Sequence, residues 1–264
     1  MVDTRDFGTA CSDFVLYLTS YICSQLVYQY SSHSSHVQSH GHSSHVHSHS
    51  YSIWQSGHFT ILIEFEPAVK SLFYVQYAAL IGVIRFGLIP RGQLIVLGHN
   101  LMTVLGQQLS ISLLGLSYFL LAFPSLSICK YFVSNFNEIF TSFERTLLII
   151  IILAHLLNIQ YIDKAIPFIF GILPIVVTIV IAQNFNIFVC GLLSLSSMTL
   201  AIYLLHQHNY RRSKLLNIRY VHWFHLLTSL SIFCHTLTLI NLANNGILTL
   251  WECLTLNFAS IQPS

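Results

Sequence analysis

The chain has 264 residues, of which 54% are hydrophobic and only 8% are charged, and its formal net charge is +2. Soluble domains carry about 25% charged residues, so eleven basic and nine acidic side chains are too few to cover a molecule of this size in water. The small net charge, and the lack of a basic patch interleaved with aromatic residues, exclude a nucleic-acid partner. The composition predicts an all-α integral membrane protein whose main partner is the lipid bilayer.

Apolar runs long enough to cross a bilayer recur along the chain. Because a membrane-spanning helix needs about 20 mainly apolar residues, we predict a bundle of about seven transmembrane helices, at 10–30, 70–89, 93–123, 145–162, 165–182, 187–206 and 219–242. We interpret the long third run as one tilted helix rather than two, and the segment that contains Asn135, Asn137 and Glu138 as a loop. The chain then divides into an N-terminus with the first span (1–30), a loop (31–58), six further helices (59–243) and a short tail (244–264).

The basic residues predict the orientation of this bundle. With seven spans, one side of the membrane receives Arg5, Arg85, Arg91, Lys164, Arg211, Arg212, Lys214 and Arg219, and the other receives Lys70, Lys130 and Arg145. Since cytoplasmic segments are enriched in lysine and arginine, we expect a cytoplasmic N-terminus. The loop at 31–58 and the C-terminus would face the lumen or the exterior.

The loop at 31–58 is rich in histidine and serine, and it contains too little apolar surface to pack a core, so it is predicted to be disordered. Imidazole binds zinc, copper and nickel, and the closely spaced His40, His42, His45, His47 and His49 are candidate ligands for a divalent metal ion. The alternative, which we favour, is a low-complexity segment that has no metal role in the cell.

A second group of polar residues lies at one depth of the predicted membrane. Asp13 is one turn into the first span, His99 is early in the third, and His222 and His225 open the seventh. Ionisable residues are costly in lipid and normally face the bundle interior. We therefore expect His225 to contact Asp13, because both need a partner and the first and last helices of a closed bundle are commonly neighbours. A carboxylate with several imidazoles can also form a catalytic zinc site, in which His99, His222 and His225 would be metal ligands and Asp13 a catalytic base.

The seven spans, the cytoplasmic N-terminus and the histidines in the segment His222-Trp223-Phe224-His225-Leu226-Leu227-Thr228 resemble the superfamily of alkaline ceramidases and progestin/adipoQ receptors. That superfamily spaces its last-helix histidines four apart, whereas they are three apart here, and Arg85 stands where it has a serine and a histidine. The resemblance implies a seven-helix fold and zinc-dependent amide hydrolysis.

Three functions stay open on the sequence alone. The first, which we favour, is a non-catalytic membrane protein with a structural, receptor-like or regulatory role. The second is a zinc-dependent lipid amidohydrolase that acts near the cytoplasmic leaflet. The third is a metal-sensing or metal-handling protein that uses the histidine-rich loop. Whether the chain is an enzyme is therefore left open.

Overall fold

The computed structural model describes residues 6–40, 53–56, 59–88, 92–182, 184–205, 214–216 and 218–245. Long helices account for most of them. The helices are α1 (Phe7–His40), α2 (Glu66–Val83), α3 (Gln93–Ala122), α4 (Ser127–Ser134), α5 (Phe136–Leu156), α6 (Gln160–Pro167), α7 (Leu173–Ile181), α8 (Phe185–Leu205) and α9 (Tyr220–Asn245). Three short turns join or extend them, namely the 3₁₀ turn η1 (Ile63–Phe65) and the π-helical turns η2 (Ile84–Leu88) and η3 (Phe168–Ile172). Two small antiparallel hairpins pair β1 (Ile53–Ser56) with β2 (Phe59–Leu62) and β3 (Lys214–Leu215) with β4 (Ile218–Arg219).

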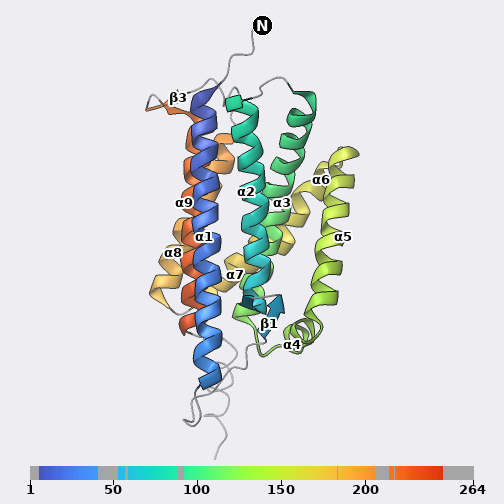
Figure 1. Cartoon of the computed structure of the whole chain (residues 1–264), viewed down its shortest axis with the longest axis vertical. Coiled ribbons are helices and arrows are strands. Elements are labelled where there is room, and N and C mark those ends of the chain that lie inside the picture. Colours follow the sequence, from blue (N-terminus) through green and yellow to red (C-terminus); the bar gives the residue numbers. More distant parts are fainter. Residues whose placement is uncertain are drawn as a thin grey trace, which may run out of the picture.

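The helices form an up-and-down bundle in which the first and last lie side by side and run in the same direction (Figure 1). Helix α1 packs between α2 and α9, while α8 packs on α9 and α3 on α2. Helices α6 and α7 form one bent rod through η3 and pack on α3, and α5 lies outside this group, against α3 and α6. The predicted contact between the first and last helices is therefore confirmed.

Six helices of the described chain are long and apolar enough to cross a membrane: Ile63–Leu88, Gln93–Ala122, Phe136–Leu156, Lys164–Ile181, Phe185–Leu205 and Tyr220–Ala243. They support the predicted α-helical membrane protein, and the long third run is one helix, as predicted. Helix α1 is not among the six because its composition is more polar.

The structure corrects the predicted loop between the third and fourth spans. This segment is helical, because α4 occupies Ser127–Ser134 and α5 already begins at Phe136. The polar residues there suggested a loop, but Phe132 of α4 packs edge-on against Phe136, which in turn stacks on Phe140 one turn further along α5. Phe136 and Phe140 of α5 are buried in a cluster with leucines of α3, and this burial outweighs the polarity of their neighbours in the chain.

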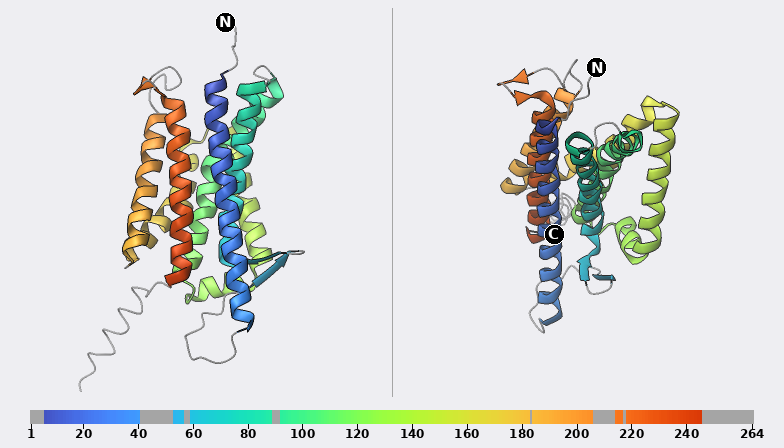
Figure 2. Two further views of the ribbon diagram at one scale, coloured as in Figure 1. Left: turned by 60° about the vertical axis from the view of Figure 1, so that its left-hand side comes forward. Right: turned by 45° about the horizontal axis from the view of Figure 1, so that its top comes forward.

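The predicted histidine-rich loop is shorter in the structure than at 31–58. Helix α1 continues to His40 and extends past its neighbours at that end (Figure 2), and β1 starts at Ile53. The predicted disorder and metal binding at His42, His45, His47 and His49 fall outside the described residues, as does the tail from residue 246 onward. These expectations stay predictions.

Helix α3 crosses η3 at a point where two glycines meet. A Cβ atom on Gly115 would lie 2.6 Å from the Cα of Gly171, and one on Gly171 would lie 2.7 Å from the carbonyl oxygen of Ile111. No side chain fits between backbones at such distances. The two helical segments therefore touch main chain to main chain, which fixes the position of the bent rod against α3.

Candidate functional site

A cavity of about 630 Å³ lies at the end of the bundle where α1, α3 and α9 begin. Its lining combines acidic, basic and hydroxyl side chains, namely Asp6, Thr9, Asp13, Arg85, His99, Thr103, Arg219, His225 and Thr228. Between them the wall is apolar, with residues such as Leu16, Val75 and Phe224. We call this space the charged cavity.

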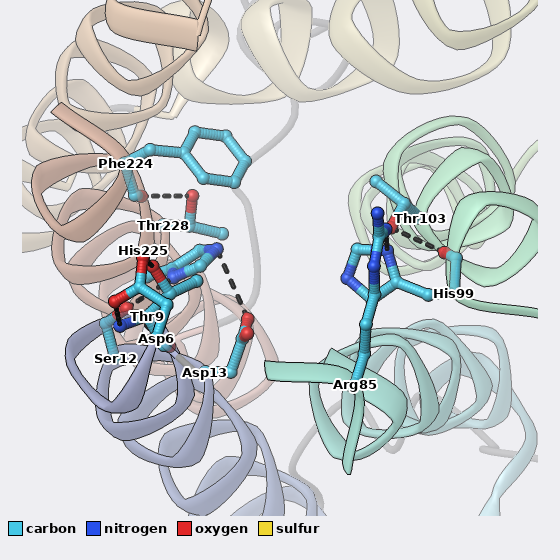
Figure 3. Close-up of polar contacts among 10 residues, drawn as sticks. All are labelled: Asp6, Thr9, Ser12, Asp13, Arg85, His99, Thr103, Phe224, His225 and Thr228. Carbon is cyan, nitrogen blue, oxygen red and sulfur yellow. Dashed lines mark hydrogen bonds and ion pairs between the residues drawn. The ribbon is translucent and has the colours of Figure 1, made fainter. Parts of the chain in front are cut away.

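One wall of the charged cavity carries a buried contact between α1 and α9. The Nε2 atom of His225 lies 3.3 Å from Oδ1 of Asp13, and Nδ1 of His225 lies 2.8 Å from the hydroxyl of Ser12 (Figure 3). Asp13 is only 3% exposed and His225 only 8%. The predicted contact between Asp13 and His225 is confirmed.

The hydrogen bonds of Ser12, His225 and Asp13 indicate where the protons of this wall lie. The Ser12 hydroxyl donates to the carbonyl oxygen of Thr9 over 2.9 Å, so its lone pairs are available to accept from Nδ1–H of His225. When Nδ1 carries a proton, the contact between Nε2 of His225 and the carboxyl group of Asp13 is a hydrogen bond only if one of these two groups carries a second proton. The pair is thus a buried proton site, and Ser12 orients its imidazole.

Helix α2 makes room for the carboxyl group at Gly82. A Cβ atom at this position would lie 2.5 Å from Oδ2 of Asp13, which is too close for any side chain. Within the described part of the chain, Oδ2 is buried and has no hydrogen-bond partner. Gly82 therefore permits Asp13 to turn inward, between α1 and α2.

The opposite wall carries the basic group Arg85, on the π-helical turn η2 that ends α2. Its Nη1 atom lies 2.8 Å from Nδ1 of His99 and donates to Oδ1 of Asn100 over 3.1 Å. The guanidinium also lies 5.0 Å from the ring of Phe86. Figure 3 shows Arg85 and His99 facing Asp13 and His225 across open space. The cavity therefore has an acidic wall and a basic wall.

An ion pair fixes the rim of the cavity. Arg219 donates to Oδ2 of Asp6 over 2.7 Å, and Thr9 donates to the same carboxylate through its backbone N–H and its hydroxyl. Burial of Asp6 acts to raise its pKa, but the hydrogen bonds from Thr9 and the charge of Arg219 outweigh it and hold the pKa below its usual value. Asp6 is thus an ionised clamp between the start of α1 and the start of α9.

The structure separates the four predicted intramembrane site residues. Asp13 and His225 touch, while His99 belongs to the opposite wall. His222 is not among the lining residues and instead packs near Gly8, where an added Cβ would lie 2.9 Å from its ring. The catalytic role predicted for Asp13 stays a prediction.

The catalytic zinc implied by the family resemblance does not fit this arrangement. Among the described side chains, no group of three or more histidines, cysteines and carboxylates could hold a metal ion. In addition, the guanidinium of Arg85 occupies the Nδ1 side of His99, where its positive charge opposes a cation. We therefore derive no reaction step through zinc.

Three contributors to the site were missed from the sequence: Ser12, Asp6 and Arg219. Asp6 precedes the predicted first span, and Arg219, the first residue of the predicted seventh span, was used only to predict the orientation. Ser12 is next to Asp13 on α1, and its role depends on which helix faces it. Arg85 carried a usable signal, because an arginine at the end of an apolar run has to be stabilised by a partner or by water.

Comparisons of the chain with protein-family models, with curated proteins and with solved structures returned no match. The resemblance to the ceramidase and progestin/adipoQ receptor superfamily therefore stays a prediction.

Proposed function

We propose that this chain is a non-catalytic, receptor-like membrane protein that binds a small zwitterionic ligand in the charged cavity. The observation that carries the proposal is the placing of Asp13 and Arg85 on opposite walls of one space. A ligand with an ammonium group and an anionic group could meet both walls at once.

The energetics favour such a ligand over a simple ion. A buried carboxylate is costly unless it is paired, and Asp13 is almost fully buried where it lines the charged cavity. An ammonium group in the charged cavity would place a positive charge beside the part of the Asp13 carboxyl group that lines the cavity. Arg85 contacts His99 and Asn100, and the planar guanidinium with its five N–H donors matches the geometry of a phosphate.

The size of the site and the position of its serine also favour binding. A volume of about 630 Å³ lies within the range of about 300–1,000 Å³ that is typical of ligand pockets. Ser12 contacts His225 but is not among the residues that line the cavity, so it is not placed to attack a bound ligand. The polar groups serve recognition.

We further propose that α1 is a seventh membrane span. Its polar residues Ser12, Asp13, Ser20 and Ser24 are buried against neighbouring helices, whereas Phe14, Val15, Leu18 and Ile22 are exposed. The exposed surface of α1 is therefore mainly apolar as far as Ile22, although the composition of the helix is not. At 1.5 Å per residue, 34 residues reach about 51 Å, which exceeds the roughly 30 Å of hydrocarbon. With the larger group of basic residues on the cytoplasmic side, as the sequence predicts, the charged cavity would open toward the cytoplasm.

Binding of phosphoethanolamine, a zwitterion without a chain, tests the proposed function. We expect the purified full chain in detergent to bind it in isothermal titration calorimetry. Asp13→Asn and Arg85→Gln should each weaken binding by about tenfold or more, because each removes a charged hydrogen-bonding partner. Lys130→Gln is the matched control, because it removes an exposed charge on α4, outside the cavity. Absence of binding to the wild-type chain, or equal binding by all variants, would overturn the proposal.

A further inference from the structure

A second cavity, of about 360 Å³, adjoins the charged cavity deeper in the bundle. The two share the lining residues Val75, Gly106, Gln107, Leu205, Phe224 and Thr228, so they meet along a common boundary. The lining of the second cavity is mainly aliphatic, with contributions from Leu72, Ile111, Leu114, Ile172 and Leu239. We call it the apolar cavity. A charged space that continues into an apolar one is complementary to a molecule with a polar head and a hydrocarbon chain.

The apolar cavity also reaches the outer surface of the bundle. Most of its wall is buried, with Ala68 at 0% and Leu239 at 1% exposure. However, Phe168 of η3 and Ile202 of α8 belong to the same lining and are 54% and 38% exposed. The cavity therefore opens sideways between η3 and α8, on a flank that is mainly apolar but also carries the exposed Lys164, which lines the same cavity.

We propose that the ligand is a single-chain amphiphile from the bilayer, whose chain occupies the apolar cavity and passes in and out between η3 and α8. This inference rests on the proposed function, because the charged cavity holds the polar head. Its occupant is argued from the shared boundary, from the lateral opening and from the volume. About 360 Å³ is at the low end of the range for ligand pockets, which suits one alkyl chain and leaves no room for a second.

The chain and the head make different energetic contributions. A chain that leaves lipid for an apolar pocket exchanges one apolar environment for another, so its transfer contributes little affinity. Binding of the chain should instead depend on free space in the apolar cavity, because a side chain that fills this cavity excludes the chain. Obstruction of the apolar cavity is therefore a more direct test than an increase in chain length.

The test compares two probes on one set of variants. Phosphoethanolamine reports on the charged cavity alone, and a lysophosphatidylethanolamine with one saturated chain reports on both cavities. Met198→Trp places an indole ring in the apolar cavity from α8, where Met198 is half-buried and does not line the charged cavity. Leu200→Trp is the matched control, because Leu200 lies two residues away, is 47% exposed and lines neither cavity.

We expect Met198→Trp to weaken binding of the lysophosphatidylethanolamine by about tenfold, while its binding of phosphoethanolamine and both affinities of Leu200→Trp stay at the wild-type values. If Met198→Trp does not fold, a photoreactive group near the end of the chain gives an independent readout in the wild-type protein. Its cross-links should map to residues of α8 and α9 such as Met198, Ile232 and Leu239.

The outcomes separate the two proposals. If phosphoethanolamine binds but the chained probe is indifferent to Met198→Trp, or cross-links only to the outer surface, the inference about the chain is overturned and the charged cavity stands. If neither probe binds, the proposed function is overturned and the inference is overturned with it.

Discussion

The contact between Asp13 and His225 joins two helices that are more than two hundred residues apart in the chain. Because their side chains are only 5% and 10% exposed, removal of either partner leaves a buried polar atom of the other without this contact. We expect Asp13→Asn and His225→Ala to be strongly non-additive in thermal stability in detergent, with a coupling energy of about 1–3 kcal/mol. The measurement is a double-mutant cycle. Additivity within error would mean that the two residues do not stabilise one another.

The ion pair between Asp6 and Arg219 should make part of the stability depend on pH. The pKa of Asp6 lies below its usual value of 3.8 in the folded protein, so its stabilising contribution is present above pH 3.8 and is lost as the pH falls through the folded pKa. Both side chains are about a third or more exposed, which limits the contribution to roughly 0.2–1 kcal/mol.

The check on Asp6 is the difference in melting temperature between the wild type and Asp6→Asn, followed from neutral pH to about pH 3. We expect a constant difference at neutral pH that shrinks once the wild-type carboxylate is protonated. A difference that grows on acidification would contradict the assignment. Arg219→Gln should show the same profile as Asp6→Asn, because it breaks the same pair.

The close crossing of α3 and η3 predicts that two glycines of α3 respond differently to substitution by alanine. Gly115→Ala should lower stability by about 1–3 kcal/mol, because the added methyl group collides with the main chain of η3. Gly98→Ala, in the same helix, meets no atom within 4 Å and should be neutral or stabilising by up to about 1 kcal/mol, because alanine favours the helix. Equal effects at the two positions, in thermal unfolding followed by circular dichroism, would refute the close crossing.

The helices were the part of the fold that the sequence predicted well, because hydrocarbon imposes a minimum length that is visible as an apolar run. The third, sixth and seventh runs ended within a few residues of α3, α8 and α9. The start of α5 was missed because its first turns are polar and lie outside the apolar run. The crossing at Gly115 and Gly171 could not be predicted, since nothing in either local sequence tells which glycine meets another helix.

The sequence predicted one part of the candidate site and not the rest. The cost of burying Asp13 and His225 was visible in the sequence, and the need for a partner led to their predicted contact. The position of Arg85 opposite Asp13 was not predicted, because the direction of its side chain depends on the π-helical turn at the end of α2. The apolar cavity has no sequence signal at all, because the residues that line it resemble any other core residues.

At the scale of the whole molecule, the seven-span arrangement predicts opposite sides for two segments. A protease site inserted in 41–52 should be cut from the lumenal or external side, and one inserted in 206–213 from the cytoplasm, because three spans at 63–88, 93–122 and 136–156 and two more at 164–181 and 185–205 separate them. The measurement is protease protection in sealed vesicles, with and without detergent. Cleavage of both sites from one side would show that the number of spans between them is even.

The close fit of Gly82 to the carboxyl group of Asp13 means that these two positions cannot change independently. Alanine at position 82 should be harmful in the wild-type background, where its methyl group would lie 2.5 Å from Oδ2. In a chain that carries Asp13→Ala the same methyl group has space to fill and should be tolerated or beneficial. A mutational path that enlarges position 82 is therefore open only after the acid has been lost, so the order of the two substitutions decides which path is viable.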